Sequence, residues 1–197
     1  MMKTTLTFIA MAIGITALLF IQNPVKASDN VKADGLSKAD IESIQYMREE
    51  EKLAHDVYTF YTEQYDIPIF RNISRSETVH QKAIMWLMDE YDVKDLSKEK
   101  IGEFNNRELQ KMYNDLTKGT TLVDALEAGA LIEEQDIHDL EMYLQKTNNA
   151  DIQRIYTNLL RGSENHLRAF SKNLTRRNIE YQPKILNLQR FLDIVQQ

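Results

Sequence analysis

The stretch IQYMREEEKLAHDVYTFY, residues 44–61, decides the fold class of this chain. Its apolar residues recur at the spacing of one helix face: Ile44, Met47, Ala54 and Tyr61. Glu51 and Tyr58 fall on the same face. A carboxylate among apolar side chains is costly to bury unless partners meet it. Residues 49–52 give the alternative interpretation, a solvated charged run, but Glu51 alone of its three glutamates lies on the stripe.

The rest of the sequence carries further helical patterns with few breaks between them. Ser37, with Asp40 three residues on, resembles a capping box and starts the first helix, which is expected to run to about Tyr65. The other expected helices cover residues 73–91, 107–116, 122–146 and 151–177, and an apolar stretch at 185–195 is expected to lie across them. Residues 66–70 form a short break and residues 92–120 a long connection. A long crossover between two closely joined helix pairs predicts a ferritin-like four-helix bundle.

Composition agrees with an all-α fold and removes several classes of chemistry. The 197 residues include only 6 Gly and 3 Pro, so little of the chain is suited to turns. No stretch alternates as a strand would. The absence of Cys excludes disulfides, zinc–thiolate sites, iron–sulfur clusters and thiol nucleophiles. The sequence also lacks a glycine-rich phosphate loop and a nucleophile elbow.

The N-terminal segment has the pattern of a secretory signal peptide. Lys3 precedes an uncharged apolar run from Leu6 to Ile21, and Val25-Lys26-Ala27 resembles a small-x-small cleavage site. The run is 16 residues, shorter than the roughly 20 that a spanning helix needs, which favours cleavage over an uncleaved anchor. We therefore expect residues 1–27 to be a signal peptide cleaved after Ala27, and the protein to be periplasmic or extracellular.

The mature chain would then consist of a flexible segment, residues 28–36, and one helical domain, residues 37–197. Removing the two lysines of the signal peptide changes the net charge from −6 to −8. Such an acidic chain is poorly suited to nucleic acid or to an anionic membrane. We expect neither nucleic-acid binding nor membrane association after cleavage.

Helices of a ferritin-like bundle carry metal ligands in a fixed pattern, a Glu on one helix of each pair and Glu-x-x-His on the other. Glu77 and His80 form a complete Glu-x-x-His, whose spacing puts both side chains on one helix face. Glu51 supplies the lone carboxylate of the first pair. An alternative use of Glu77 is a capping box with Ser74.

The second pair of helices is less complete. Glu133 and Glu134 both border the apolar stripe of their helix, and the sequence does not choose between them. Asp136, three residues after Glu133, could add a carboxylate. His138 follows Glu134, and His55 follows Glu51, by four residues each; the simpler interpretation of both pairs is a contact on the helix surface.

The last helix contains His166 but has Ser163 where a Glu-x-x-His motif requires Glu. Glu164 precedes His166 by only two residues and points to another side of a regular helix. Gly162 indicates either a close approach of another element or a local bulge. With three carboxylates, one divalent ion is expected to bind well and a second weakly, unless Asp136 or Glu164 moves in.

Two families resemble these stretches. Residues 51–58, EKLAHDVY, resemble the first metal helix of rubrerythrins. Longer stretches are similar to the ferritin-like domain-of-unknown-function 2202 family: MREEEKLA from Met47, PIF from Pro68, SETVH from Ser76, GALIEEQDIHDLE from Gly129 and LLRGSENHLRAF from Leu159. The resemblance spans about residues 40–185. It implies a ferritin-like fold, in a family whose function is itself undefined. Iron or manganese is the expected cofactor because hard carboxylate oxygens together with imidazole suit these metals.

Carrying over the rubrerythrin pattern implies a specific set of ligands. These metal ligands are Glu51, Glu77, His80, Glu133 or Glu134, and His166. Tyr58 would hydrogen-bond a ligating carboxylate, and Ser163 would stand in place of one ligand. A cysteine-bearing rubredoxin segment is missing, so electrons would come from a separate donor. We also expect that the protein can form a homo-oligomer.

The sequence thus supports two hypotheses about function. The first is an exported carboxylate protein that binds one or two iron or manganese ions, for metal oxidation, peroxide handling or metal sequestration. The second is a non-enzymatic helical binding module whose metal site has degenerated, which Ser163 favours. The sequence leaves open whether the protein is an enzyme.

Overall fold

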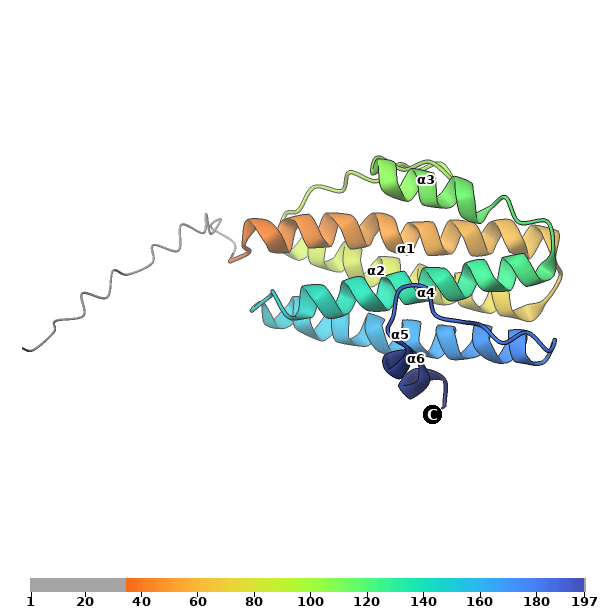
Figure 1. Ribbon diagram of the computed structural model, residues 1–197. Coiled ribbons are helices and arrows are strands. Elements are labelled where there is room, and N and C mark those ends of the chain that lie inside the picture. The colour runs from red at the N-terminus through yellow and green to blue at the C-terminus, as the bar shows by residue number, and fades with distance from the viewer. Residues whose placement is uncertain (1–34, 197) are drawn as a thin grey trace, which may run out of the picture.

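The computed structural model describes residues 35–196, which form six helices and no strand (Figure 1). The helices are α1 (Lys38–Gln64), α2 (Pro68–Glu90), α3 (Arg107–Leu116), α4 (Leu122–Leu144), α5 (Ala150–Thr175) and α6 (Leu188–Val195). The all-α prediction is confirmed for this part of the chain. The predicted signal peptide lies outside the described residues.

Side-chain caps explain where most of the helices begin. Ser37 and Asp40 form the predicted capping box of α1, and Thr121 and Asp124 form another on α4. Asparagine side chains cap α3, α5 and α6. α2 has no side-chain cap and begins instead with Pro68, which needs no hydrogen-bond acceptor in the first turn. The helix therefore starts five residues before the predicted position.

The four long helices lie side by side. α1 packs along α2 and α4 packs along α5, while α2 also contacts α5 and α1 contacts α4. Figure 1 shows that α1 and α5 run in one direction and α2 and α4 in the other. The chain from α2 to α4 therefore returns along the length of the molecule, and α3 in this connection packs on α1.

Buried polar side chains divide the interior into two apolar clusters. One cluster gathers around Tyr58, Phe70 and Phe170, and the other around Met47 and Leu87. Between them each long helix buries polar residues at the same level: Glu51 on α1, Glu77 and His80 on α2, Glu133 and Asp136 on α4, and Ser163 and His166 on α5. We call these seven residues the polar layer. A polar group enclosed by apolar walls needs partners, which makes this layer the candidate site.

The two ends of the described chain also pack onto this core. Leu36, expected in the flexible segment, is only 1% exposed and belongs to the second apolar cluster. At the other end α6 packs against α5, as the apolar stretch at 185–195 predicts. None of the helices described has the length and hydropathy required to span a membrane.

Candidate metal centre

Two groups of potential ligand atoms meet within the polar layer and share one residue. Glu51, Glu77 and His80 form the first group, and Glu77, Glu133 and His166 form the second. In each group the ligand atoms lie within 4.8 Å of one another. The Glu77 carboxylate stands between the two groups. The positions predicted for Glu51, Glu77, His80 and His166 therefore converge in the folded chain.

The two imidazoles direct the same nitrogen toward the carboxylates. Nδ1 of His80 lies 3.2 Å from Oε2 of Glu51 and 2.8 Å from Oε2 of Glu77. Nδ1 of His166 lies 2.9 Å from Oε1 of Glu77 and 3.4 Å from Oε2 of Glu133. The rings stack with 5.5 Å between centroids. The Oγ atom of Ser76 lies 3.0 Å from Nε2 of His166 and fixes the orientation of its ring.

Gly162 allows the imidazole of His80 to lie against α5. A Cβ atom at position 162 would lie 2.5 Å from Nε2 of His80, closer than such atoms can approach. α5 is an uninterrupted α-helix through this position. Of the two interpretations of Gly162, close approach is therefore right and a bulge is wrong.

The structure separates the two adjacent glutamates that the sequence left undecided. Glu133 faces the polar layer, and the Tyr58 hydroxyl donates a hydrogen bond of 2.5 Å to its Oε1 atom. Glu134 faces the C-terminal tail instead, where it accepts hydrogen bonds from the Tyr181 hydroxyl and from the backbone N–H groups of residues 184–186. Glu134 therefore does not join the candidate site, because consecutive residues of a helix point to different sides.

Glu134 ties down the segment that leads to α6. Replacing it by Ala leaves the Tyr181 hydroxyl and three backbone N–H groups without their acceptor, so the free energy of unfolding should fall by about 3 kcal/mol. Amide hydrogen exchange should accelerate at residues 184–186. The same change at the exposed Glu90 should leave both measurements unaltered, and unchanged exchange in E134A would refute this anchoring role.

Ser163 acts together with Asp136. The Ser163 hydroxyl donates a hydrogen bond to Oδ2 of Asp136 from the facing helix, and Oδ1 of Asp136 has no hydrogen-bond partner among the described residues. Charge interactions couple this carboxylate to Glu51, Glu133 and Glu77. Glu164 points elsewhere and pairs with Arg190. Asp136 is thus the carboxylate that reaches the level of Ser163.

Burial and mutual repulsion alter the proton affinities of these acids. Burial raises the pKa of Glu51 to about 7, and burial with nearby carboxylates raises the pKa of Asp136 well above its usual range. Burial also raises the pKa of Glu133. Glu77 differs: burial opposes its ionisation, but the charges of His166 and His80 outweigh that effect and hold its pKa far below normal. The shared residue, Glu77, is therefore the strongest acid of the layer.

The same carboxylates hold both imidazoles in their charged form. Burial alone would lower the pKa of His80, but Glu51 and Glu77 raise it to about 12. His166 is likewise opposed by burial and raised by Glu133 and Glu77 to about 10. In the metal-free protein the neighbouring carboxylates therefore keep both imidazoles protonated despite their burial.

Four potential metal-ligand atoms of the layer are buried without a hydrogen-bond partner in the described chain. They are Oε1 of Glu51, Oε1 of Glu77, Oδ1 of Asp136 and Nδ1 of His166. Two of these atoms, Glu77 Oε1 and His166 Nδ1, lie 2.9 Å apart but are not aligned for a hydrogen bond. Atoms that converge without pairing fit a bound cation, which would satisfy all of them at once.

Two glutamates of α1, Glu49 and Glu50, lie in surroundings that the sequence did not predict. Glu49 and Glu50 are buried, so the solvated charged run is wrong. Glu49 accepts hydrogen bonds from the backbone N–H groups of Asn105 and Asn106, in the long connection. Glu50 is 2% exposed and both of its carboxylate oxygens lack hydrogen-bond partners within residues 35–196. The burial of Glu50 was missed because it lies off the apolar stripe of α1.

Neither of the two remaining histidines pairs with the glutamate four residues before it. Nδ1 of His55 lies 3.0 Å from Asp56, and Nδ1 of His138 lies 2.9 Å from Asp139. The expected surface contacts with Glu51 and Glu134 are therefore wrong, because those carboxylates are engaged inside the molecule. The Ser74 capping box is also wrong, since α2 begins at Pro68 and Ser74 lies within it.

Comparisons with a family model, with a known sequence and with a solved structure all find uncharacterized proteins. Residues 40–197 match the family model described as an uncharacterized protein domain, DUF2202. The uncharacterized protein MJ0754 of Methanocaldococcus jannaschii is 39% identical over 163 residues, which cover 81% of this chain and 88% of the relative. The crystal structure of hypothetical protein MJ0754 from Methanococcus jannaschii superposes with a TM-score of 0.80 at 38% identity, over 82% of this chain and 94% of that one.

Proposed function

Because this chain belongs to the DUF2202 family of uncharacterized domains, we propose its function from the site itself: a ferritin-like carboxylate protein that binds two iron or manganese ions. The observation that carries this proposal is the pair of ligand groups sharing Glu77. The common direction of α2 and α4, joined by the long connection, supports a ferritin-like four-helix bundle with a crossover.

The donor set favours iron or manganese over softer metals. It consists of carboxylate oxygens and imidazole nitrogens, without a thiolate. Glu51, Glu77, Glu133 and Asp136 together carry four negative charges when ionised. Two divalent ions bring four positive charges, so the filled layer would be neutral in its water-poor surroundings.

Asp136 changes the expected stoichiometry. Ser163 alone implies three carboxylates and one tightly bound ion. Asp136 of α4, which contacts Ser163, is a fourth carboxylate at this level. This supports two bound ions rather than one. It also argues against a degenerate site, since Asp136 on the facing helix provides the carboxylate that α5 lacks at Ser163.

Individual residues would hold and tune the ions as follows. Glu77 would bridge, with His80 and Glu51 on one side and His166 and Glu133 on the other. Tyr58 orients Glu133, and the two apolar clusters keep bulk water away. Bound iron or manganese would supply one-electron redox chemistry toward oxygen or peroxide. Because the chain has no cysteine, it has no rubredoxin-type iron centre to deliver electrons and would depend on a separate electron donor.

Two roles remain within this proposal, and turnover distinguishes them. An enzyme that oxidises metal or removes peroxide would act repeatedly when electrons are supplied, whereas a sequestering protein would hold its ions and turn over at most once. Export to the periplasm or the extracellular space, with cleavage after Ala27, is part of the proposal. Mass spectrometry of the protein recovered outside the cytoplasm would test the cleavage position.

Metal analysis tests the basic proposal. The protein is purified without chelator and without an affinity tag, and its iron and manganese are quantified per chain. We expect close to two ions in total. A protein that contains neither metal, and takes up neither when they are offered anaerobically, would instead favour the non-enzymatic binding module.

Stability of the metal-free protein should fall as pH rises. Between the ordinary pKa of 4.5 and the raised pKa of about 7, the folded state keeps a proton on Glu51 that the unfolded chain releases. His166, whose pKa rises from 6.5 to about 10, extends the fall to higher pH. Glu77 acts in the opposite sense, but only on acidification below its ordinary pKa. The urea midpoint should therefore be lower at pH 8 than at pH 5.5.

Metal binding should show the opposite pH dependence. The ligands bind a cation only after releasing their protons, so the affinity for Mn²⁺ should increase from pH 5.5 to pH 8. Glu51→Gln should reduce the pH dependence of the urea midpoint and leave the part that is due to His166. A midpoint that rises over this range in the metal-free protein would contradict the assignment of raised proton affinity to the polar layer.

A further inference from the structure

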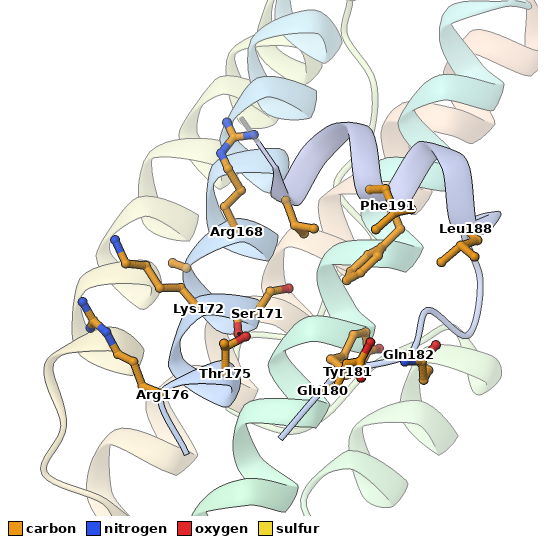
Figure 2. A pocket seen from close by; sticks show the side chains of 13 residues that line it. Arg168, Ser171, Lys172, Thr175, Arg176, Glu180, Tyr181, Gln182, Leu188 and Phe191 are labelled. Carbon is orange, nitrogen blue, oxygen red and sulfur yellow. Dashed lines mark hydrogen bonds between the residues drawn. The ribbon is translucent and has the colours of Figure 1, made fainter. Parts of the chain in front are cut away.

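A cavity lies between α5 and the C-terminal segment that contains α6 (Figure 2). Its volume is about 750 Å³, within the range of sites that hold small organic molecules. None of its lining residues belongs to the polar layer. Whatever it binds is therefore separate from the proposed metal ions.

One side of this cavity is apolar. Tyr181 and Phe191 line it with their rings, whose centroids are 5.9 Å apart. Leu188 of α6 also lines it and is 57% exposed, which is unusual for a leucine in a packed helix. Figure 2 shows these three side chains on the same side of the cavity. Tyr181 and Phe191 are otherwise buried, so Leu188 is the part of this wall that is open to water, and covering it with hydrocarbon is favourable.

The opposite rim of the cavity is cationic. Arg168, Lys172 and Arg176 follow one another at intervals of four residues on α5, so they share one helix face. Like charges at this spacing repel one another, and here they gather on a chain whose net charge is −6. Within residues 35–196, Lys172 and Arg176 form no ion pair. Glu180, exposed, also lines the cavity and leaves the local charge positive.

A buried hydroxyl faces the space between the rim and the apolar wall. Ser171 is 9% exposed, and its Oγ atom has no hydrogen-bond partner in the described chain. Figure 2 shows it between Lys172 and Phe191. A buried hydroxyl without a partner costs free energy, which an acceptor oxygen on a ligand would recover.

We propose that this cavity binds a single anionic amphiphile, such as a fatty acid. Its head group lies at Lys172, Arg176 and the Ser171 hydroxyl, and its hydrocarbon chain covers Leu188 beside the edges of Tyr181 and Phe191. A small inorganic anion would leave the apolar wall in water. A neutral hydrocarbon would leave the cationic rim and the hydroxyl without partners. Only a molecule with both parts meets all three features.

Calorimetric titration of the full-length protein with dodecanoate, below the concentration at which it forms micelles, tests this proposal. We expect saturable binding of one molecule per chain. Dodecyltrimethylammonium, which has the same hydrocarbon chain with a cationic head group, should not bind. Equal binding of the two compounds, or no saturable binding of dodecanoate, would overturn the proposal.

Charge-reversal variants locate the site. K172E/R176E changes two exposed side chains, so the fold should survive, and the affinity for dodecanoate should fall by about tenfold. K82E/K98E makes the same change of net charge outside the cavity and should leave the affinity unchanged. Circular dichroism checks both folds. Equal affinities in the two variants would show that dodecanoate binds elsewhere.

Vesicles distinguish a free amphiphile from a membrane surface. Cosedimentation with phosphatidylglycerol vesicles is measured beside the dodecanoate titration. Binding to vesicles without binding to monomeric dodecanoate would assign this region to a lipid surface and overturn the proposal. Dodecanoate binding that prevents any vesicle association would support it.

Discussion

Replacing Glu77 by Gln should remove both metal ions from the protein. Glu77 belongs to both ligand groups, and the amide of Gln has neither the charge nor the second carboxylate oxygen that a bridge requires. Each ion should bind at least about 100-fold more weakly. The side chain keeps its size, so the fold should remain. Anaerobic titration with Fe²⁺ or Mn²⁺, followed by calorimetry, measures the effect.

Two further variants control this experiment. Glu134→Gln changes another buried glutamate, one that accepts its hydrogen bonds from the C-terminal tail, and should leave metal binding unaltered. Glu51→Gln should weaken one ion and spare the other, because Glu51 belongs to one group only. Binding of two ions by the Glu77 variant at the affinity of the original chain would show that Glu77 does not bridge.

Asp136→Asn should leave one tightly bound ion and weaken the second by about 100-fold. Asp136 provides the fourth negative charge, and without it two divalent ions exceed the charge of the layer. The exchange D136S/S163E returns a carboxylate to the same level from α5 and should restore the second ion. Calorimetric stoichiometry of both variants, compared with the original chain, measures this.

The exchange variant also separates charge from structural damage. If Asp136→Asn only disturbed packing, a second substitution at its hydrogen-bond partner would not restore binding. Two ions bound equally well by Asp136→Asn would mean that three carboxylates suffice, and that Asp136 has no part in the site.

The helices were predictable because their signals are local. Capping residues and an apolar stripe within α1 indicate both its start and its buried face, and the spacing of Glu77 and His80 is read within one helix. The start of α2 differs from the prediction because the residues around Pro68 have the composition of a break, although proline is well tolerated in a first helical turn.

The rest of the site depends on contacts between distant parts of the chain. Glu133 and Glu134 both border the stripe of α4, and what separates them is a tail some fifty residues further on, whose backbone amides hold Glu134. The partnership of Ser163 and Asp136 joins α5 to α4. Helical spacing describes one helix at a time, so it left Asp136 as one option among several.

The most direct test of the central claim is anomalous X-ray diffraction from crystals of the protein loaded with Mn²⁺. We predict two manganese peaks in each chain, about 3.5–4 Å apart, with the Glu77 carboxylate between them. Glu51 and His80 should contact one peak, and Glu133 and His166 the other. A layer without manganese, or ions bound only at surface carboxylates, would contradict the account.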